Sequence, residues 1–152
     1  MIAVRLVCVG RLKEKFYQEA CREYEKRLGA YCRLEIRELP EEAGRPDGLR
    51  REGERIEQAI LPSSRVVALC VEGEMMSSEA LARRLSEWQA QGVSRLTLII
   101  GSSEGLDGAV KARAGLRLSM SPMTFPHHLA RVMVLEQLYR ALSIGAGGKY
   151  HK

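Results

Sequence analysis

The fold is decided by the stretch Leu98-Ile99-Ile100-Gly101-Ser102-Ser103-Glu104-Gly105-Leu106, in which an apolar run enters a turn bracketed by two glycines. A second loop follows, Leu118-Ser119-Met120-Ser121-Pro122-Met123-Thr124-Phe125-Pro126-His127, and the chain closes with Lys149-Tyr150-His151-Lys152. Turns that follow neighbouring parallel strands meet at one edge of a sheet and offer backbone donors and acceptors. We therefore expect a cofactor cradle here, with a polar tail that supplies chemistry.

The pattern upstream of this stretch alternates between strands and helices. Residues 2–9 are apolar and β-branched and end at Gly10, residues 32–39 alternate between apolar and charged, and residues 66–71 and 96–100 are continuously apolar. A brief strand is expected at 116–118. Helices are expected at about 16–28, 49–60, from Ser77 or Ser78 onward, 107–114 and 127–144. This order predicts an α/β fold with a largely parallel sheet flanked by helices.

The first helix is expected to be amphipathic. Phe16, Ala20, Tyr24 and Leu28 recur at intervals of four residues, with Tyr17 and Cys21 beside them. Such spacing places side chains on one helix face, which we expect to be buried.

Length and composition favour a single domain, residues 1–152, because 152 residues with 45% hydrophobic side chains can build one core. No apolar run approaches the roughly 20 residues of a membrane span, and the N-terminus is typical of a strand rather than a leader peptide. The cysteines lack paired C-x-x-C spacing, and no cysteine lies near His127, His128 or His151. Reduced thiols in a cytoplasmic protein without a metal site are therefore expected.

The positive charge belongs to the second half of the chain. Residues 1–76 contain 14 Lys or Arg and 14 Asp or Glu, whereas residues 77–152 contain 10 and 5, which accounts for the net charge of +5. The cations that flank the candidate site suit a polyanionic partner such as RNA. They are Lys111, Arg113, Arg117, Arg131, Arg140, Lys149 and Lys152.

The last helix is apolar around most of its circumference, which is wider than the single stripe of a surface helix. A homodimer built on this helix would cover its second face. A central helix buried within one subunit is the alternative.

One motif suggests a different chemistry. Gly101-Ser102-Ser103-Glu104-Gly105 fits the G-x-S-x-G pattern of a nucleophile elbow, and Glu136 and His151 follow in the order of a serine hydrolase with Ser103 as nucleophile. Against this alternative, the chain is short for such an enzyme and offers no second glycine-rich segment for an oxyanion hole.

The order of motifs resembles the RlmH (YbeA) family of the SPOUT superfamily, whose members methylate N3 of a pseudouridine in the 23S ribosomal RNA of the large subunit. The resemblance covers nearly the full length. Its most specific parts are Ile100-Gly101, Glu104-Gly105-Leu106, Leu118-Ser119, Met123-Thr124-Phe125-Pro126-His127, Arg131, Glu136-Gln137-Leu138-Tyr139-Arg140-Ala141 and Tyr150-His151-Lys152.

The resemblance implies a SPOUT-type α/β trefoil-knot fold in a homodimer, with 23S rRNA in the ribosome as substrate. It implies S-adenosyl-L-methionine bent into the knot, held by Leu69, Gly101, Met120, Ser121, Pro122, Met123, Thr124 and Phe125. The candidates for the chemistry are Arg131 as a phosphate or base contact, Tyr150 as a stacking platform or donor, and His151 as base or proton relay. The tail is expected to reach the cofactor of the partner subunit.

Three positions depart from the family pattern. Ser102 stands where the family repeats glycine, Pro122 falls inside the cofactor loop, and Lys149 replaces the proline before Tyr-His. These departures motivate a third alternative, an RNA-binding module with an inactive cofactor site.

Overall fold

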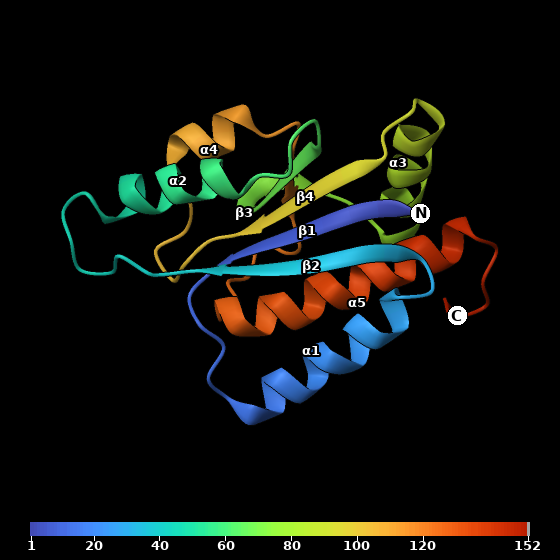
Figure 1. Cartoon of the computed structure of the whole chain (residues 1–152), viewed down its shortest axis with the longest axis horizontal. Helices are drawn as coiled ribbons and strands as arrows, with labels where there is room; N and C mark the ends of the chain where they lie inside the picture. The colour runs from blue at the N-terminus through green and yellow to red at the C-terminus, as the bar shows by residue number, and fades with distance from the viewer. Residues whose placement is uncertain (152) are drawn as a thin grey trace.

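A computed structural model, which describes residues 1–151, contains one sheet of five parallel strands in the order β2-β1-β4-β3-β5 (Figure 1). The strands are β1 Ile2–Val9, β2 Cys32–Leu39, β3 Arg65–Met75, β4 Arg95–Ile100 and β5 Leu116–Ser119. The helices are α1 Lys15–Leu28, α2 Gly48–Ala59, α3 Ser78–Ala90, α4 Gly108–Arg113 and α5 His127–Gly145. The expected α/β class and parallel sheet are confirmed, with element ends within a few residues of those predicted.

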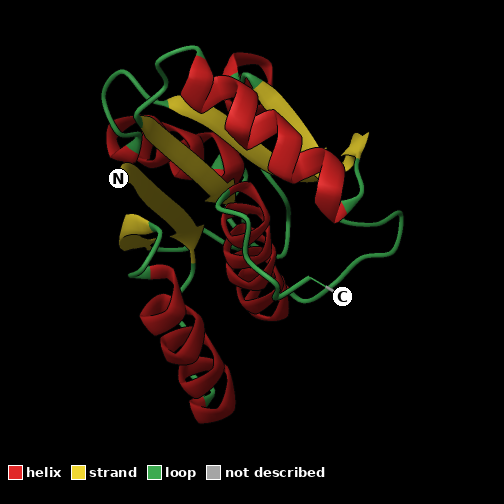
Figure 2. Cartoon of the chain, turned by 90° about the vertical axis from the view of Figure 1, so that its right-hand side faces the viewer, coloured by secondary structure: helices red, strands yellow, loops and turns green. Residues whose placement is uncertain are grey.

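Helices cover both faces of the sheet (Figure 2). The side chains of β1 alternate between two cores, because successive residues of a strand point to opposite faces. Val4 and Leu6 pack in the core beneath α1, α3 and α5, whereas Val7 and Val9 pack in the core beneath α2 and α4. Residues buried on both faces explain why β1 and β4 are almost continuously apolar.

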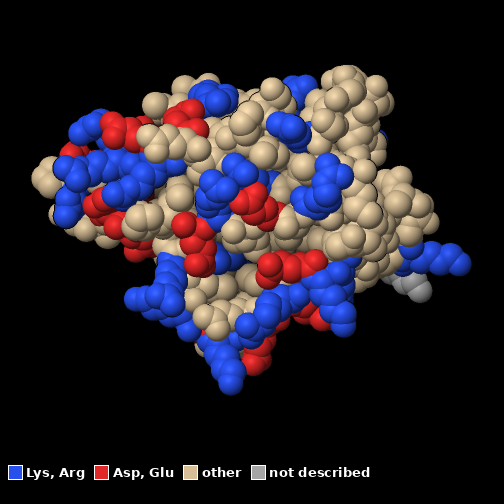
Figure 3. Space-filling view, viewed as in Figure 1, with Lys and Arg blue, Asp and Glu red and all other residues tan. Residues whose placement is uncertain are grey.

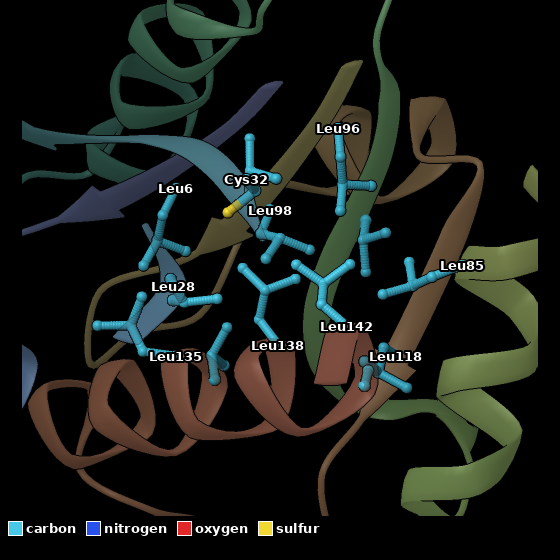
Figure 4. Packing of buried hydrophobic residues seen from close by; sticks show 14 of the residues in the cluster. Leu6, Leu28, Cys32, Leu85, Leu96, Leu98, Leu118, Leu135, Leu138 and Leu142 are labelled. Atoms are coloured by element: carbon cyan, nitrogen blue, oxygen red, sulfur yellow. The ribbon is translucent and has the colours of Figure 1, made fainter. Parts of the chain in front are cut away.

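Leucines dominate the larger core (Figure 4). Leu135 and Leu138 of α5 project toward the sheet, where they meet Leu6 and Leu98, and Leu28 closes the side nearest α1. Helix α5 also packs against α1 and α3. Leu129 and Met133 of α5 stay partly exposed and belong to neither core.

The first helix corrects an expectation. Phe16 is 64% exposed, and the buried face of α1 is formed by Tyr17, Cys21, Tyr24 and Leu28. A helix turns about 100° per residue, so a strict four-residue spacing drifts by about 40° at each step. Over three steps the drift carries Phe16 out of the face, whereas spacings of four, three and four residues stay on it.

Strand β3 is longer than expected, because it continues past Val71 to Met75 beside β5. The register shifts on the way, so that Leu69 and Glu74 both pair with Leu118. Gly73 lies within this irregular segment, and a Cβ there would come within 2.7 Å of the Arg117 carbonyl oxygen. Glycine therefore allows the two strands to approach closely.

In the described part of the chain, no helix is long and apolar enough to cross a membrane.

Candidate active site

A cleft of about 660 Å³ opens at the ends of β4 and β5 and beside residues 69–72 of β3. Its size suits a ligand as large as a nucleoside derivative. The cleft is lined by seven of the eight positions expected to hold a cofactor, namely Leu69, Gly101, Met120, Ser121, Met123, Thr124 and Phe125. Pro122, the eighth, is exposed and does not line it.

The turn after β4 forms one wall of the cleft and depends on its two glycines. The Gly105 N–H donates to the Ser102 carbonyl oxygen at 2.9 Å, and Gly105 has a φ of +89°, a conformation that favours glycine. A Cβ on Gly101 would collide with the carbonyl oxygen of Gly105. The backbone of this turn can therefore lie close to a ligand only with glycine at position 101.

The side chain of Ser102 is hydrogen-bonded to a residue outside the turn. Its hydroxyl donates to Oε1 of Glu52 on α2 at 3.0 Å, and Oε2 of Glu52 accepts the Glu42 N–H at 2.9 Å. Ser102 and Glu52 are only 6% and 3% exposed. Glu52 therefore fixes the turn to the loop that precedes α2, and the serine hydroxyl does not stand free in the cleft.

The loop after β5 forms the opposite wall. Ser119 donates through its hydroxyl to the Ser121 carbonyl oxygen at 3.1 Å, and the Met123 N–H donates to the Ser121 hydroxyl at 3.0 Å. These bonds fix the loop, while the Met123 side chain stays 73% exposed. With half-buried Leu69, Met123 gives the cleft apolar surface beside a polar backbone. Apolar side chains beside polar backbone groups fit the adenosine and methionine parts of S-adenosylmethionine.

His127 lies at the floor of the cleft, next to His128 with 4.2 Å between ring centroids. Burial and the neighbouring charge of His128 lower the pKa of His127 from its usual 6.5, although Glu41 at 3.1 Å opposes the change. The cleft therefore favours the neutral form of His127.

Arg131 lies behind the cleft and does not line it. Its guanidinium donates to Oε2 of Glu38 at 2.7 Å and to the Gly10 carbonyl oxygen at 3.1 Å, and its side chain is 5% exposed. Burial raises the pKa of Glu38, but the hydrogen bonds from Arg131 and from the Leu12 N–H outweigh this effect and lower it. Arg131 therefore joins α5 to the ends of β1 and β2.

The tail forms a second cluster on the C-terminal half of α5. Nδ1 of His151 lies 3.0 Å from Arg140 Nη1, and Nε2 lies 2.6 Å from Oε1 of Glu79 on α3. Because arginine can only donate, Nδ1 accepts and the proton of the neutral ring is on Nε2, from which it is donated to Glu79. Tyr150 donates to Glu136 at 3.3 Å and lies under the Arg140 guanidinium.

The structure does not bring the cleft and the tail cluster of one chain together. Ala130 lines the cleft, whereas Arg140 lies ten residues further along α5, which is about 15 Å along the helix. Figure 1 places the C-terminus at the opposite end from the carboxyl ends of the strands. Neither His151 nor Glu136 lines the cleft that contains Ser103, so the order Ser103, Glu136, His151 does not correspond to a catalytic triad within the chain.

Three residues of these sites are not among the catalytic or cofactor-binding residues expected from the sequence. Glu52 is one charge within the run Arg50-Arg51-Glu52-Gly53-Glu54-Arg55, and nothing in the sequence marks it as buried. Glu79 is likewise an ordinary first-turn acid of a helix. Arg140 has a signal, because it lies within the family motif, but the sequence does not distinguish its role from that of Arg131.

The remaining predictions for the described residues concern metals and thiols. The four cysteines carry free thiols, and burial raises the pKa of Cys8 to about 12. No group of three or more His, Cys, Asp or Glu side chains within residues 1–151 is arranged to hold a metal ion.

The chain is similar to known methyltransferases along its whole length. The family model described as "Predicted SPOUT methyltransferase" matches residues 2–151. A protein of Bifidobacterium adolescentis named "Ribosomal RNA large subunit methyltransferase H" is 48% identical over 159 residues, which cover 98% of this chain and 99% of the relative.

Two solved structures share the fold at low identity. A probable methyltransferase from Bordetella pertussis has a TM-score of 0.61 and 16% identity, and the match covers 91% of this chain and 95% of the other. A probable methylase family protein from Haemophilus influenzae has a TM-score of 0.57 and 13% identity over 98% of this chain and 70% of the other. With a matching family model and a relative of 48% identity, this chain belongs to the SPOUT methyltransferase family and, within it, to the ribosomal RNA large subunit methyltransferases H.

Proposed function

We propose that this protein uses S-adenosyl-L-methionine to methylate N3 of a pseudouridine in 23S ribosomal RNA, with the assembled ribosome or its large subunit as substrate. The observation that carries the proposal is the cleft at the carboxyl edge of the sheet, formed by the two loops that the resemblance assigns to the cofactor. The 48% identical relative supports the ribosomal substrate. A ribosomal substrate also makes the cytoplasm the expected location.

The cofactor is proposed to lie between the turn after β4 and the loop after β5. Backbone groups around Gly101 and Thr124 are expected to bind the adenine edge and the methionine end, with Leu69, Met123 and Phe125 as apolar walls. When bound, S-adenosylmethionine supplies a methyl group on a sulfonium, which is already an activated leaving group. The chain's own contribution is then to position the acceptor base and to handle its N3 proton.

The tail cluster is proposed to perform this second task. Arg140 can stabilise the negative charge that develops on the base as N3 loses its proton. His151 is the proposed proton acceptor, but Nδ1 must first give up its bond to Arg140. Tyr150 is proposed to stack on or donate to the base. Arg131, buried against Glu38, enters the proposal as a positioning residue that fixes the ends of β1 and β2.

A homodimer is part of the proposal, because the tail and the cleft of one chain are separated along α5. A two-fold arrangement on the partly exposed face of α5, which includes Leu129 and Met133, would bring each tail to the partner's cleft. The trefoil knot and the single domain of 1–152 belong to the same proposal. The knot is proposed because the chain matches the SPOUT methyltransferase family model.

The decisive experiment supplies radiolabelled S-adenosylmethionine and large subunits from a strain that lacks the modification. Methyl transfer to a pseudouridine of 23S RNA is expected, with N3 identified by mass spectrometry of the nucleosides. Transfer of the radiolabelled methyl group to another position, or no transfer, would contradict the proposal.

The same preparation tests the two alternatives. Calorimetry that detects S-adenosylmethionine binding excludes an inactive cofactor site. A fluorophosphonate should leave Ser103 unlabelled, and labelling of Ser103 would restore the hydrolase alternative.

A further inference from the structure

The segment that joins β1 to α1, together with the start of α1, exposes three cations and an aromatic ring to solvent. Arg11, Lys13 and Lys15 are exposed, and Phe16 is 64% exposed at the start of α1. None of the three cations forms an ion pair with an acidic side chain of the described residues. We propose that residues 11–16, which we call the docking turn, bind the ribosomal RNA substrate, with the cations on phosphates and Phe16 stacked on an unpaired base.

The acidic residues nearby do not cancel this charge. Glu14, within the turn, lies 3.1 Å from Nδ1 of His128, and Glu38 is paired with Arg131. Glu41 lies against His127. Their carboxylates are turned toward α5, while the three cations of the docking turn face solvent. In Figure 3, Lys and Arg side chains lie along the lower edge of the molecule, where α1 is found, with some Asp and Glu side chains among them.

The docking turn is connected to the cleft by a series of ring contacts. Phe16 and Tyr17 have ring centroids 4.4 Å apart, Tyr17 and His128 6.4 Å, and His128 and His127 4.2 Å. His127 lines the cleft. The docking turn is therefore linked to the proposed active site through three ring contacts, and it lies on the same side of the molecule as the carboxyl ends of the strands (Figure 1).

The combination of exposed cations with an exposed aromatic ring indicates which kind of partner binds here. Single exposed hydrophobic residues are common on protein surfaces, so Phe16 alone would carry no argument. An exposed aromatic ring among unpaired cations is the arrangement that binds single-stranded RNA, because every base offers a face for stacking and every nucleotide a phosphate. A base that is methylated must itself be unstacked, so unpaired neighbours are expected beside it. The inference rests on the proposed function, whose substrate it locates on the surface.

The test uses the full-length protein with large subunits as substrate. We expect Phe16→Ala and Phe16→Leu to raise the KM for subunits roughly tenfold, and Phe16→Trp to restore it, because only an aromatic ring stacks. The double variant Lys13→Gln/Lys15→Gln should raise the KM and flatten the dependence of RNA affinity on salt by about one unit of logarithmic slope per lost phosphate contact. The value of kcat at saturating subunits and the Kd for S-adenosylmethionine should stay unchanged.

The matched control is Arg33→Gln/Arg83→Gln, which removes two exposed cations from β2 and α3. Its KM should equal that of the wild type. If the docking-turn variants also show the wild-type KM, or if they lose the dimer in sedimentation, the inference is overturned. If the wild-type protein methylates nothing, the proposed function fails instead, and filter binding of the same variants to large-subunit RNA still decides the docking turn.

Discussion

Arg131 on α5 and Glu38 on β2 lie 93 residues apart in the sequence, and their Nη1 and Oε2 atoms are 2.7 Å apart. The same guanidinium donates to the Gly10 carbonyl oxygen, so one side chain ties the helix behind the cleft to the ends of two strands. This arrangement explains why an arginine occurs in an otherwise apolar part of α5. An arginine offers several fixed donors, whereas lysine offers a single charged nitrogen.

Replacement of Arg131 by Met is expected to lower the free energy of unfolding by about 2–3 kcal/mol, because Glu38 and the Gly10 carbonyl lose their charged donor. Urea denaturation measures the change. The control is Glu54→Gln on α2, since Glu54 is exposed and pairs with exposed Arg50; its loss should stay below about 1 kcal/mol. An Arg131→Met variant as stable as this control would contradict the positioning role.

Gly101→Ala is expected to abolish measurable binding of S-adenosylmethionine, because the added methyl group collides with the carbonyl oxygen of Gly105 and displaces the turn. Gly108→Ala is the matched control, since a Cβ at Gly108 meets nothing within 4 Å. Calorimetry should show wild-type affinity for the control. Equal affinities for the two variants would show that the turn after β4 does not hold the cofactor.

Ser102→Ala tests whether the buried hydroxyl supports the cofactor turn. The variant removes the hydrogen bond to Glu52, so we expect a loss of about 1.5–3 kcal/mol in stability, the usual range for a bond to a charged group. The Kd for S-adenosylmethionine should also rise in this variant. Ser94→Ala, at an exposed position just before β4 and outside the cleft, is the control and should change neither quantity. A wild-type Kd for Ser102→Ala would mean that Glu52 and Ser102 stabilise the protein without shaping the cleft.

The sequence predicted the sheet well because strand signals are local. In β1 most side chains enter one of two cores, and this burial requires the apolar, β-branched run that the sequence shows. The face of α1 was less certain, because an error of one residue in spacing moves Phe16 from core to solvent. The extension of β3 depends on its pairing with β5, a long-range contact that the local sequence does not indicate.

The site was predictable in part for a related reason. The cofactor loops are continuous motifs, so seven of eight proposed residues line one cleft. Glu52 and Glu79 act through partners 50 and 72 residues away, and the sequence around each is an ordinary charged helix. Only the folded chain distinguishes these carboxylates from their solvated neighbours.

Stability should fall as the pH drops below about 6.5, the ordinary pKa of His127. The folded pKa of His127 is lowered, chiefly by burial, so the unfolded chain binds a proton more readily than the folded one. The folded state is therefore fully favoured above 6.5 and loses stability as the pH falls toward the folded pKa. His127→Asn should flatten the decline in Tm between pH 7 and pH 5. An identical decline in the variant would assign the effect to other groups.

Complementation between subunits tests the tail most sharply. A chain truncated after Gly148 lacks Tyr150 and His151 but keeps its cleft, so it should still dimerise and bind S-adenosylmethionine while methylation is lost. A Gly101→Ala chain keeps its tail but lacks a cofactor site. If each tail serves the partner's cleft, mixed dimers of the two defective chains contain one complete site and should recover up to half of the wild-type rate.

Arg140→Gln within the Gly101→Ala chain should remove this recovery, because Arg140 holds His151 at 3.0 Å. The same change in the truncated chain should leave the recovery intact. No recovery in the mixed dimers would place each tail on its own cleft.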